Sequence, residues 1–215
     1  MLTIKHHLIK LYTTNCFLIS DDQSGEFAIV DPGRCSESLI AKIEAYRKKG
    51  EFKYILLTHG HFDHIGGVSD LKKLYPNAKV AISMQDADFL SDTSLSLGRG
   101  SVLAHMQPLT PEVTLNDGDV LKLGESKIKF IHTPGHTGGS GCFVFDSTIL
   151  AGDTLFYEEI GRVDLPTGNG EQMLKSLQKL KNLDGDYTVY TGHGPFTTLE
   201  HERKNNQYIL KNKII

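Results

Sequence analysis

Thr58-His59-Gly60-His61-Phe62-Asp63-His64 is the stretch of sequence that decides the fold. An apolar run at 54–57, typical of a buried strand, precedes it, and a helical pattern follows it up to Tyr75. The cluster therefore lies where a strand ends and a helix begins, which is where open α/β sheets usually place their sites. Burying three imidazoles and a carboxylate without partners would be costly, so the pattern indicates metal ligands.

The composition narrows the class of protein. The chain has 215 residues with 39% hydrophobic content, which suits a single domain over 1–215 with a sizeable core. Its net charge of −3 gives no electrostatic case for binding nucleic acid or an anionic membrane surface. The three cysteines are widely spaced, and no apolar run resembles a signal peptide or a membrane span. We therefore predict a cytoplasmic protein, a monomer or a homodimer, that acts on a small molecule.

The first half of the chain shows the pattern of an antiparallel meander followed by helices. Strands are expected at 8–11, 16–20 and 27–30, with Asn15 in the turn between the first two. Pro32 and Gly33 stop the third strand, and Ser36 can cap a helix that continues to about Lys49. A strand at 79–82 and a short helix at 84–90 follow the histidine cluster.

The second half repeats this organisation. Asn116-Asp117-Gly118 is a hairpin signal between expected strands at 113–115 and 120–123, and a further strand is expected at 127–132. Another hairpin is expected from strands at 143–145 and 148–151. Between the halves, 91–107 is expected to form a surface loop in which His105 is an ordinary loop histidine. The two halves are predicted to form sheets that face each other, with helices outside.

Three later turns each present a possible ligand just after an apolar strand. His136 follows Pro134 and Gly135, Asp153 follows Gly152, and His193 lies between two glycines that let the backbone approach a ligand closely. Added to the first cluster, they make a set of five histidines and two aspartates. A mononuclear zinc site needs three or four protein ligands, so this set is too large for one ion and suits two.

The spacing of these residues predicts how two ions divide them. We expect His59, His61 and His136 to hold the first ion and a second set, with Asp153 as the bridging carboxylate, to hold the other. That second set is Asp63, His64 and His193. We expect Asp63, His64 and Asp153 to be the catalytic residues. Nitrogen and oxygen ligands without a thiolate suit two divalent ions, zinc above all, with iron and manganese as alternatives.

Asp31 lies at the end of a strand beside the one that leads to His59. It is either a turn residue or the acceptor for the free N–H of a ligand imidazole, a contact that would set the tautomer of that ring.

Four motifs together resemble those of the metallo-β-lactamase superfamily, and within it the glyoxalase II (hydroxyacylglutathione hydrolase) branch. They are Thr58 to His64, Pro134-Gly135-His136-Thr137, Gly152-Asp153-Thr154-Leu155-Phe156 and Gly192-His193-Gly194. The resemblance extends from Asn15 to the last helix and implies an αββα four-layer sandwich of the α/β class with a dinuclear site between the sheets. It also supports the same seven ligands, with Asp31 behind them. A cysteine at position 153 would suggest a true β-lactamase, and this chain has none there.

The thiol part of the substrate is where the chain departs from that branch. Only a short segment follows His193, so the chain resembles the short bacterial forms without the C-terminal helical domain that helps to bind glutathione. The Lys and Tyr that hold the glutathione backbone in that branch are replaced by residues 161–166. Arg162 in this segment can act as a carboxylate clamp, or it can form an internal ion pair with Asp164 or Glu158.

These features predict hydrolysis of a thioester by a metal-bridging hydroxide. S-2-hydroxyacyl-glutathione, for example S-lactoyl-glutathione, or a thioester of a related thiol is the expected substrate. A thiolate leaves as an anion, and no spare His, Glu or Lys among the motifs can protonate an amine. One alternative is a mononuclear iron persulfide dioxygenase that uses His59, His136 and Asp153. A lactonase or phosphodiesterase of the same superfamily is another, and a metal-stabilised binding module would need only a closed site of four ligands.

Overall fold

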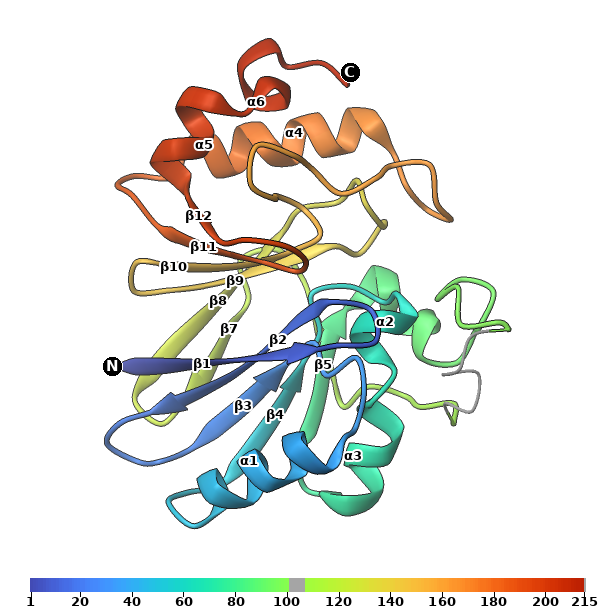
Figure 1. Ribbon diagram of the computed structural model, residues 1–215, viewed down its shortest axis with the longest axis vertical. Helices are drawn as coiled ribbons and strands as arrows, with labels where there is room; N and C mark the ends of the chain where they lie inside the picture. Colours follow the sequence, from blue (N-terminus) through green and yellow to red (C-terminus); the bar gives the residue numbers. More distant parts are fainter. Residues whose placement is uncertain (101–106, 215) are drawn as a thin grey trace.

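The computed structural model describes residues 1–100 and 107–214 and contains two six-stranded sheets that face each other (Figure 1). The first sheet has the order β1 (Leu2–Ile9), β2 (Thr14–Asp21), β3 (Phe27–Val30), β4 (Phe52–Leu56), β5 (Lys79–Ser83) and β6 (Val113–Leu115). Strands β1 to β3 are antiparallel neighbours, and β3 to β6 are parallel. The carboxyl ends of β3, β4 and β5 therefore meet at one edge of the sheet.

The second sheet is built from the C-terminal half of the chain. Its order is β12 (Thr197–Thr198), β11 (Thr188–Thr191), β10 (Thr148–Gly152), β9 (Gly141–Phe145), β8 (Ser126–His132) and β7 (Val120–Leu123). Only β10 and β11 are parallel among these neighbours in the described part of the chain. Because of this pairing, the residues that follow β10 and β11 leave the sheet side by side.

Helices cover the outer faces of both sheets (Figure 1). α1 (Glu37–Arg47) and α3 (Val68–Leu74) pack on the first sheet, and α1 begins at Ser36, whose side chain accepts a hydrogen bond from the Leu39 N–H. The second sheet is covered by α4 (Gly170–Lys181), α5 (Leu199–Asn205) and α6 (Gln207–Lys211). A third core, which includes Phe130 and Phe143, lies between the sheets. The predicted four-layer sandwich is confirmed.

Two short helices occupy the edge where the parallel strands end. α2 (Phe62–Ile65) follows β4 after a tight loop, and the 3₁₀ helix η1 (Met84–Leu90) follows β5 directly. Within residues 1–100 and 107–214, no helix combines the length and the apolar composition that crossing a bilayer requires. His105, predicted to be a loop histidine, lies outside the described residues.

The hairpin predicted over 113–123 is wrong. β6 pairs with β5 in the first sheet, whereas β7 pairs with β8 in the second. The turn at Asn116 to Asp119, with φ of +87° at Gly118, carries the chain from one sheet to the other. Leu115 and Leu121 enter the core between the sheets from opposite sides. A local turn signal cannot distinguish this crossing from a hairpin, because both need the same backbone conformation.

The boundaries of the first two strands also differ from the prediction. The first strand starts at Leu2 and ends at Ile9, because the whole of β1 finds a partner in β2. Asn15 lies inside β2 and not in the turn. Its buried side-chain amide donates hydrogen bonds to the carbonyl groups of Thr191 and Gly194, on either side of His193. The hairpin predicted from 143 to 151 is confirmed as β9 and β10.

Candidate metal centre

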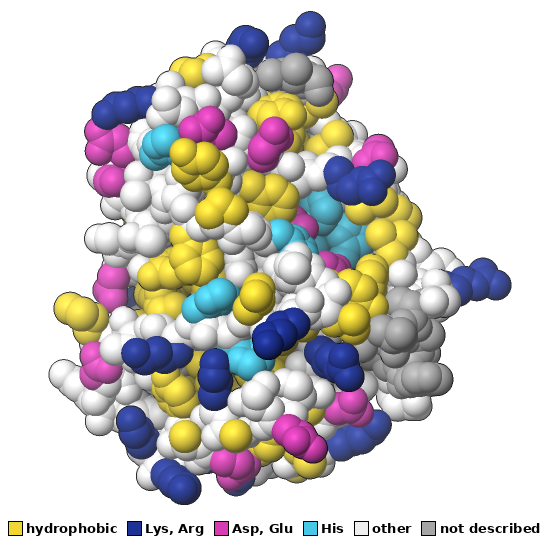
Figure 2. Space-filling model, in the orientation of Figure 1, with side chains coloured by type: hydrophobic (Ala, Val, Ile, Leu, Met, Phe, Trp, Pro, Cys, Tyr) yellow, Lys and Arg dark blue, Asp and Glu magenta, His cyan; other side chains and the backbone are white. Residues whose placement is uncertain are grey.

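All seven predicted ligands lie at the edge where the parallel strands of both sheets end. Figure 2 shows histidine side chains gathered in a hollow of the surface, with hydrophobic side chains beside them. The loop after β4 and helix α2 supply four ligands, and the other three follow β8, β10 and β11. The set consists of His59, His61, Asp63, His64, His136, Asp153 and His193.

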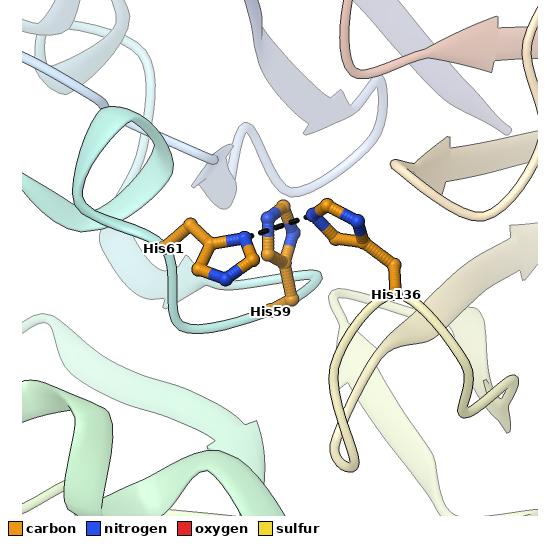
Figure 3. A group of neighbouring side chains, drawn as sticks. All are labelled: His59, His61 and His136. Atoms are coloured by element: carbon orange, nitrogen blue, oxygen red, sulfur yellow. Dashed lines mark hydrogen bonds between the residues drawn. The ribbon is translucent and has the colours of Figure 1, made fainter. Parts of the chain in front are cut away.

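The first group of candidate ligands is formed by His59, His61 and His136. Their ligand atoms lie within 4.8 Å of one another, and Figure 3 shows the three rings, carried by two separate loops, pointing toward one another. His61 Nδ1 and His136 Nε2 are 2.8 Å apart. The Arg162 carbonyl, 2.8 Å from His136 Nδ1, can only accept a hydrogen bond, so that nitrogen carries the proton. This leaves the lone pair of His136 Nε2 facing the group.

The second group is formed by Asp63, His64 and His193, which also lie within 4.8 Å of one another. His193 Nε2 is 3.1 Å from Asp63 Oδ2 and 3.2 Å from His64 Nε2. His193 Nδ1 donates to the carbonyl of Thr13 at 3.3 Å, so its Nε2 lone pair also faces inward. Both groups thus present lone pairs to a common centre.

Asp153 lies between the two groups. Its Oδ1 is 3.4 Å from His64 Nε2, and its Oδ2 is 3.5 Å from His136 Nε2 and 3.6 Å from His193 Nε2. The carboxylate therefore contacts histidines of both groups, which is the position that a bridging ligand between two ions would take.

The donor set fits divalent metal ions. Two buried atoms that face the centre have no hydrogen-bond partner within the described residues, His59 Nε2 and Asp153 Oδ1. Buried polar atoms nearly always have a partner, and unpaired ones are costly. Imidazole nitrogens and carboxylate oxygens that converge on one region are the ligands that zinc and related ions prefer. We infer that cations complete these contacts.

Burial and nearby histidines favour the neutral form of His59 and His61 in the first group. Burial, followed by the nearby His64 and His136, holds the pKa of His59 well below its usual range. Burial and the neighbouring His136 lower the pKa of His61 to about 3. Only a neutral imidazole can offer a lone pair to a metal, so these two rings are ready to bind one at neutral pH.

The carboxylates around the second group favour a positive charge at this position. Burial alone would lower the pKa of His64, but Asp153, Asp63 and Asp31 outweigh it and raise the pKa to about 10. Burial likewise opposes ionisation of Asp63, but His64 and His193 hold its pKa below the usual range. The field that favours a proton on His64 also favours a divalent cation at this position.

Asp31 lies behind the ligands and contacts two of them, one directly and one through Thr58. Its Oδ2 is 3.0 Å from His64 Nδ1 and accepts a hydrogen bond from Thr58 Oγ1 at 2.6 Å. Thr58 Oγ1 is in turn 3.1 Å from His59 Nδ1. These contacts orient both rings with Nε2 toward the centre. The role of Thr58 was not predicted, although its position immediately before His59 was a usable signal.

The glycine before His193 lets the backbone approach the Asp153 carboxylate closely. A Cβ atom at Gly192 would lie 2.1 Å from Asp153 Oδ1. We therefore expect Gly192→Ala to displace the Asp153 carboxylate and to lower kcat/KM about 10²-fold, the usual cost of a shift of about 1 Å in a catalytic group. Gly138→Ala is the matched control, because a Cβ there meets Thr167 at 3.6 Å, an ordinary contact. Steady-state kinetics of the two variants test the prediction, and equal rates would contradict it.

A cavity of about 430 Å³ opens over the ligands. Beyond the ligands, its walls are formed mainly by four apolar side chains, Phe62, Leu97, Phe156 and Leu165. Arg162 also lines it, and both of its contacts with Asp164 are 2.7 Å long. Of the two interpretations of Arg162, the structure shows the ion pair with Asp164, while Glu158 pairs with His201. Leu97 brings the described part of the 91–107 loop into the cavity wall.

The four-layer fold and this cluster of histidines and aspartates define a metal-binding α/β protein. Comparison with known families agrees: the chain belongs to the Metallo-beta-lactamase superfamily, whose family model matches residues 9–193. It therefore has the fold and the ligand cluster of the metallo-hydrolases, and this class implies divalent metal ions as cofactors.

Individual relatives within this superfamily carry names that describe different activities and metal contents. The hydroxyacylglutathione hydrolase GloC of Haemophilus influenzae is 34% identical over 205 residues, which cover 94% of this chain and 95% of GloC. The BLEG-1 B3 metallo-beta-lactamase superposes with a TM-score of 0.86 at 30% identity, covering 96% of this chain and 99% of that one. TTHA1623, solved in a di-iron-bound form, superposes with a TM-score of 0.82 at 28% identity and covers 95% and 99% of the two chains.

Proposed function

We propose that this protein is a dinuclear metal-dependent hydrolase that cleaves a thioester, either an S-2-hydroxyacyl-glutathione or a thioester of a related thiol. The observation that carries the proposal is the make-up of the cavity. It combines two ligand groups that share Asp153 with walls that are otherwise apolar apart from Arg162. This cavity suits a substrate with an apolar portion and a leaving group that departs without a proton.

The leaving group is the feature that separates a thioester from other acyl compounds. Among the described residues that line the cavity, every His and Asp belongs to the ligand set. The side chains that remain are apolar, except for Arg162, which stays protonated at any ordinary pH. None of them can donate a proton to a departing amine or alkoxide. A thiolate needs no such donor, because it is stable as an anion.

The residues around the reacting bond have distinct tasks in this proposal. Two divalent ions, when bound, would lower the pKa of water enough to make it a nucleophile and would stabilise the developing negative charge. Asp31 and Thr58 keep His64 and His59 in the tautomer that presents Nε2. Phe62, whose ring packs edge-on against Tyr12 with centroids 5.0 Å apart, provides a fixed apolar wall that excludes water.

The relative named hydroxyacylglutathione hydrolase supports a glutathione thioester, because its similarity to this chain covers nearly all of both proteins. Arg162 is the cavity residue that can meet a carboxylate of the thiol. Arg162 forms an ion pair with Asp164, and the two side chains are 63% and 66% exposed. An exposed pair of this kind contributes little to stability, so a substrate carboxylate can compete for the guanidinium.

A matched pair of substrates tests the leaving group directly. For a thioester and an oxygen ester with the same acyl and alkyl parts, we expect kcat/KM to favour the thioester by roughly 10²–10⁴-fold, after correction for their rates with hydroxide. That is the factor that a general acid usually contributes. Equal corrected rates would contradict the thioester assignment, and rapid opening of a β-lactam ring would move the protein toward the activity named for BLEG-1.

The other reactions considered from the sequence predict different measurements. A persulfide dioxygenase that used His59, His136 and Asp153 would contain one iron per chain and consume oxygen with a persulfide. A lactonase or phosphodiesterase would contain two ions but prefer oxygen leaving groups. Elemental analysis together with oxygen uptake therefore separates the dioxygenase from the proposed thioesterase, and the preference for a sulfur or an oxygen leaving group separates the lactonase and the phosphodiesterase from it. The cytoplasmic location and the monomeric or homodimeric state stay predictions.

A further inference from the structure

Besides Asp31, a second buried carboxylate lies beside the metal centre without belonging to the ligand set. Asp86, in the first turn of η1, is fully buried. Its Oδ2 accepts hydrogen bonds from the Gly60 N–H at 2.9 Å and from Thr137 Oγ1 at 2.7 Å, and its Oδ1 accepts one from the Gly139 N–H at 2.7 Å. All three donors belong to the two loops that carry the first group of ligands.

These two loops come from different sheets. Gly60 lies between His59 and His61 in the loop after β4 of the first sheet, whereas Thr137 follows His136 in the loop between β8 and β9 of the second. η1 packs between them so tightly that neither loop has room for a side chain at its point of contact. A Cβ at Gly60 would lie 2.3 Å from Phe89, and a Cβ at Gly139 would lie 2.5 Å from Asp86.

The three hydrogen bonds offset part of the cost of burying the charge of Asp86. Asp86 forms no ion pair with any residue in 1–100 or 107–214. Burying a carboxylate is costly, and hydrogen bonds to a charged acceptor are roughly twice as strong as those between neutral groups. The arrangement therefore holds the two loops at a set separation, because moving either loop would leave part of a buried charge unpaired.

We propose that Asp86 is a positioning residue for the first metal ion: by joining the two loops, it holds His61 and His136 at the separation that binding a divalent cation requires. The proposal depends on the metal centre and not on the identity of the substrate.

The same contacts explain why Asp86 acts on one ion more than on the other. His64 is oriented by Asp31, and His193 by the carbonyl of Thr13. Neither of these second-group ligands is in a loop that Asp86 contacts. Loss of Asp86 should therefore loosen the first group and leave the second nearly intact.

Metal titration tests the proposal without any substrate. The metal-free protein is titrated with Co²⁺ while binding and the visible absorption bands of the ion are recorded. His61→Ala and His193→Ala identify which binding step belongs to which group. In Asp86→Asn, the amide N–H₂ must face a backbone or hydroxyl donor, so we expect the first-group step to weaken roughly 10–100-fold, as substitutions behind metal ligands usually do. Its absorption bands should change, and the second-group step should stay within about twofold.

Glu202→Gln is the matched control. Glu202 is also fully buried and accepts three hydrogen bonds, from Thr197 Oγ1, the Glu158 N–H and Asn206 Nδ2, but it joins elements of the C-terminal region. It should lower the melting temperature and leave both Co²⁺ steps unchanged. If Asp86→Asn behaves in the same way, or weakens both steps equally, Asp86 only stabilises the fold and the proposal is wrong.

A milder variant covers the case in which Asp86→Asn does not fold. Thr137→Val removes one of the three donors and keeps the shape of the side chain. It should weaken the same step by a smaller factor, and unchanged Co²⁺ binding in this variant would overturn the proposal.

A second readout is the rescue of Asp86→Asn by metal. Because Asp86 positions ligands without touching substrate, saturating metal should restore most of kcat in this variant.

Discussion

Asp153→Asn is expected to lower kcat for a thioester by roughly 10³-fold and to reduce the number of ions bound per chain. The substitution keeps the shape of the side chain but removes the negative charge that lies between the two histidine groups. Stabilisation by a metal centre is worth several kcal/mol, and about 4 kcal/mol corresponds to roughly 10³-fold in rate. Kinetics and elemental analysis on the same preparation measure both effects.

Two controls keep this result interpretable. Asp184→Asn makes the same chemical change at an exposed position and should leave both turnover and metal content unchanged. The melting temperature of Asp153→Asn, recorded without metal, shows whether the variant is folded. Wild-type turnover with two bound ions in Asp153→Asn would mean that the shared carboxylate is assigned to the wrong residue.

Removing metal with a chelator is expected to lower the melting temperature by about 10–20 °C. Each ion present at 100 times its dissociation constant stabilises the folded state by about 2.7 kcal/mol, and two ions by about 5 kcal/mol. One kcal/mol shifts the melting temperature of a domain of this size by roughly 2–4 °C. Calorimetry of the chelated protein before and after adding Zn²⁺, Fe²⁺ or Mn²⁺ measures the shift and ranks the metals.

The ligand set predicts which changes reduce this shift. His64→Ala should lose about half of it, because one of two ions is weakened. His201→Ala should retain all of it, since His201 pairs with Glu158 at the surface and contacts no ligand. Ca²⁺ should have little effect, because it prefers oxygen ligands to imidazole. A melting temperature that does not respond to any transition metal would remove the basis for a metal centre.

The sequence alone singled out the seven candidate ligands because they lie directly after apolar strands or within the next few residues. Strand ends, tight turns at glycine and proline, and clusters of histidine are local signals, so His59, His136 and His193 could be named without a structure. The four-layer sandwich could also be predicted, because two sets of strand patterns with helices between them allow few arrangements. The parallel pairing of β10 with β11 places Asp153 beside His193, and that of β3 with β4 places Asp31 beside the loop that carries His59.

Features that depend on which segments of the chain pack together could not be predicted from the sequence. The turn at 116–119 gave a correct local signal, yet its two flanking strands joined different sheets, because the free edges of β5 and β8 were available to them. Arg162 had two interpretations, and only the packed chain shows its pair with Asp164.

The contacts behind the ligands also depend on which segments pack together. The sequence determined which residues can bind metal, since that depends on residue type and on where strands end. Tertiary structure alone decided that Asp31 reaches His64, that Thr58 links it to His59, and that Asp86 joins the loops of the two sheets. The physical reason is that a buried carboxylate takes its partners from whatever donors packing brings within 3 Å or so, and packing is a property of the whole chain.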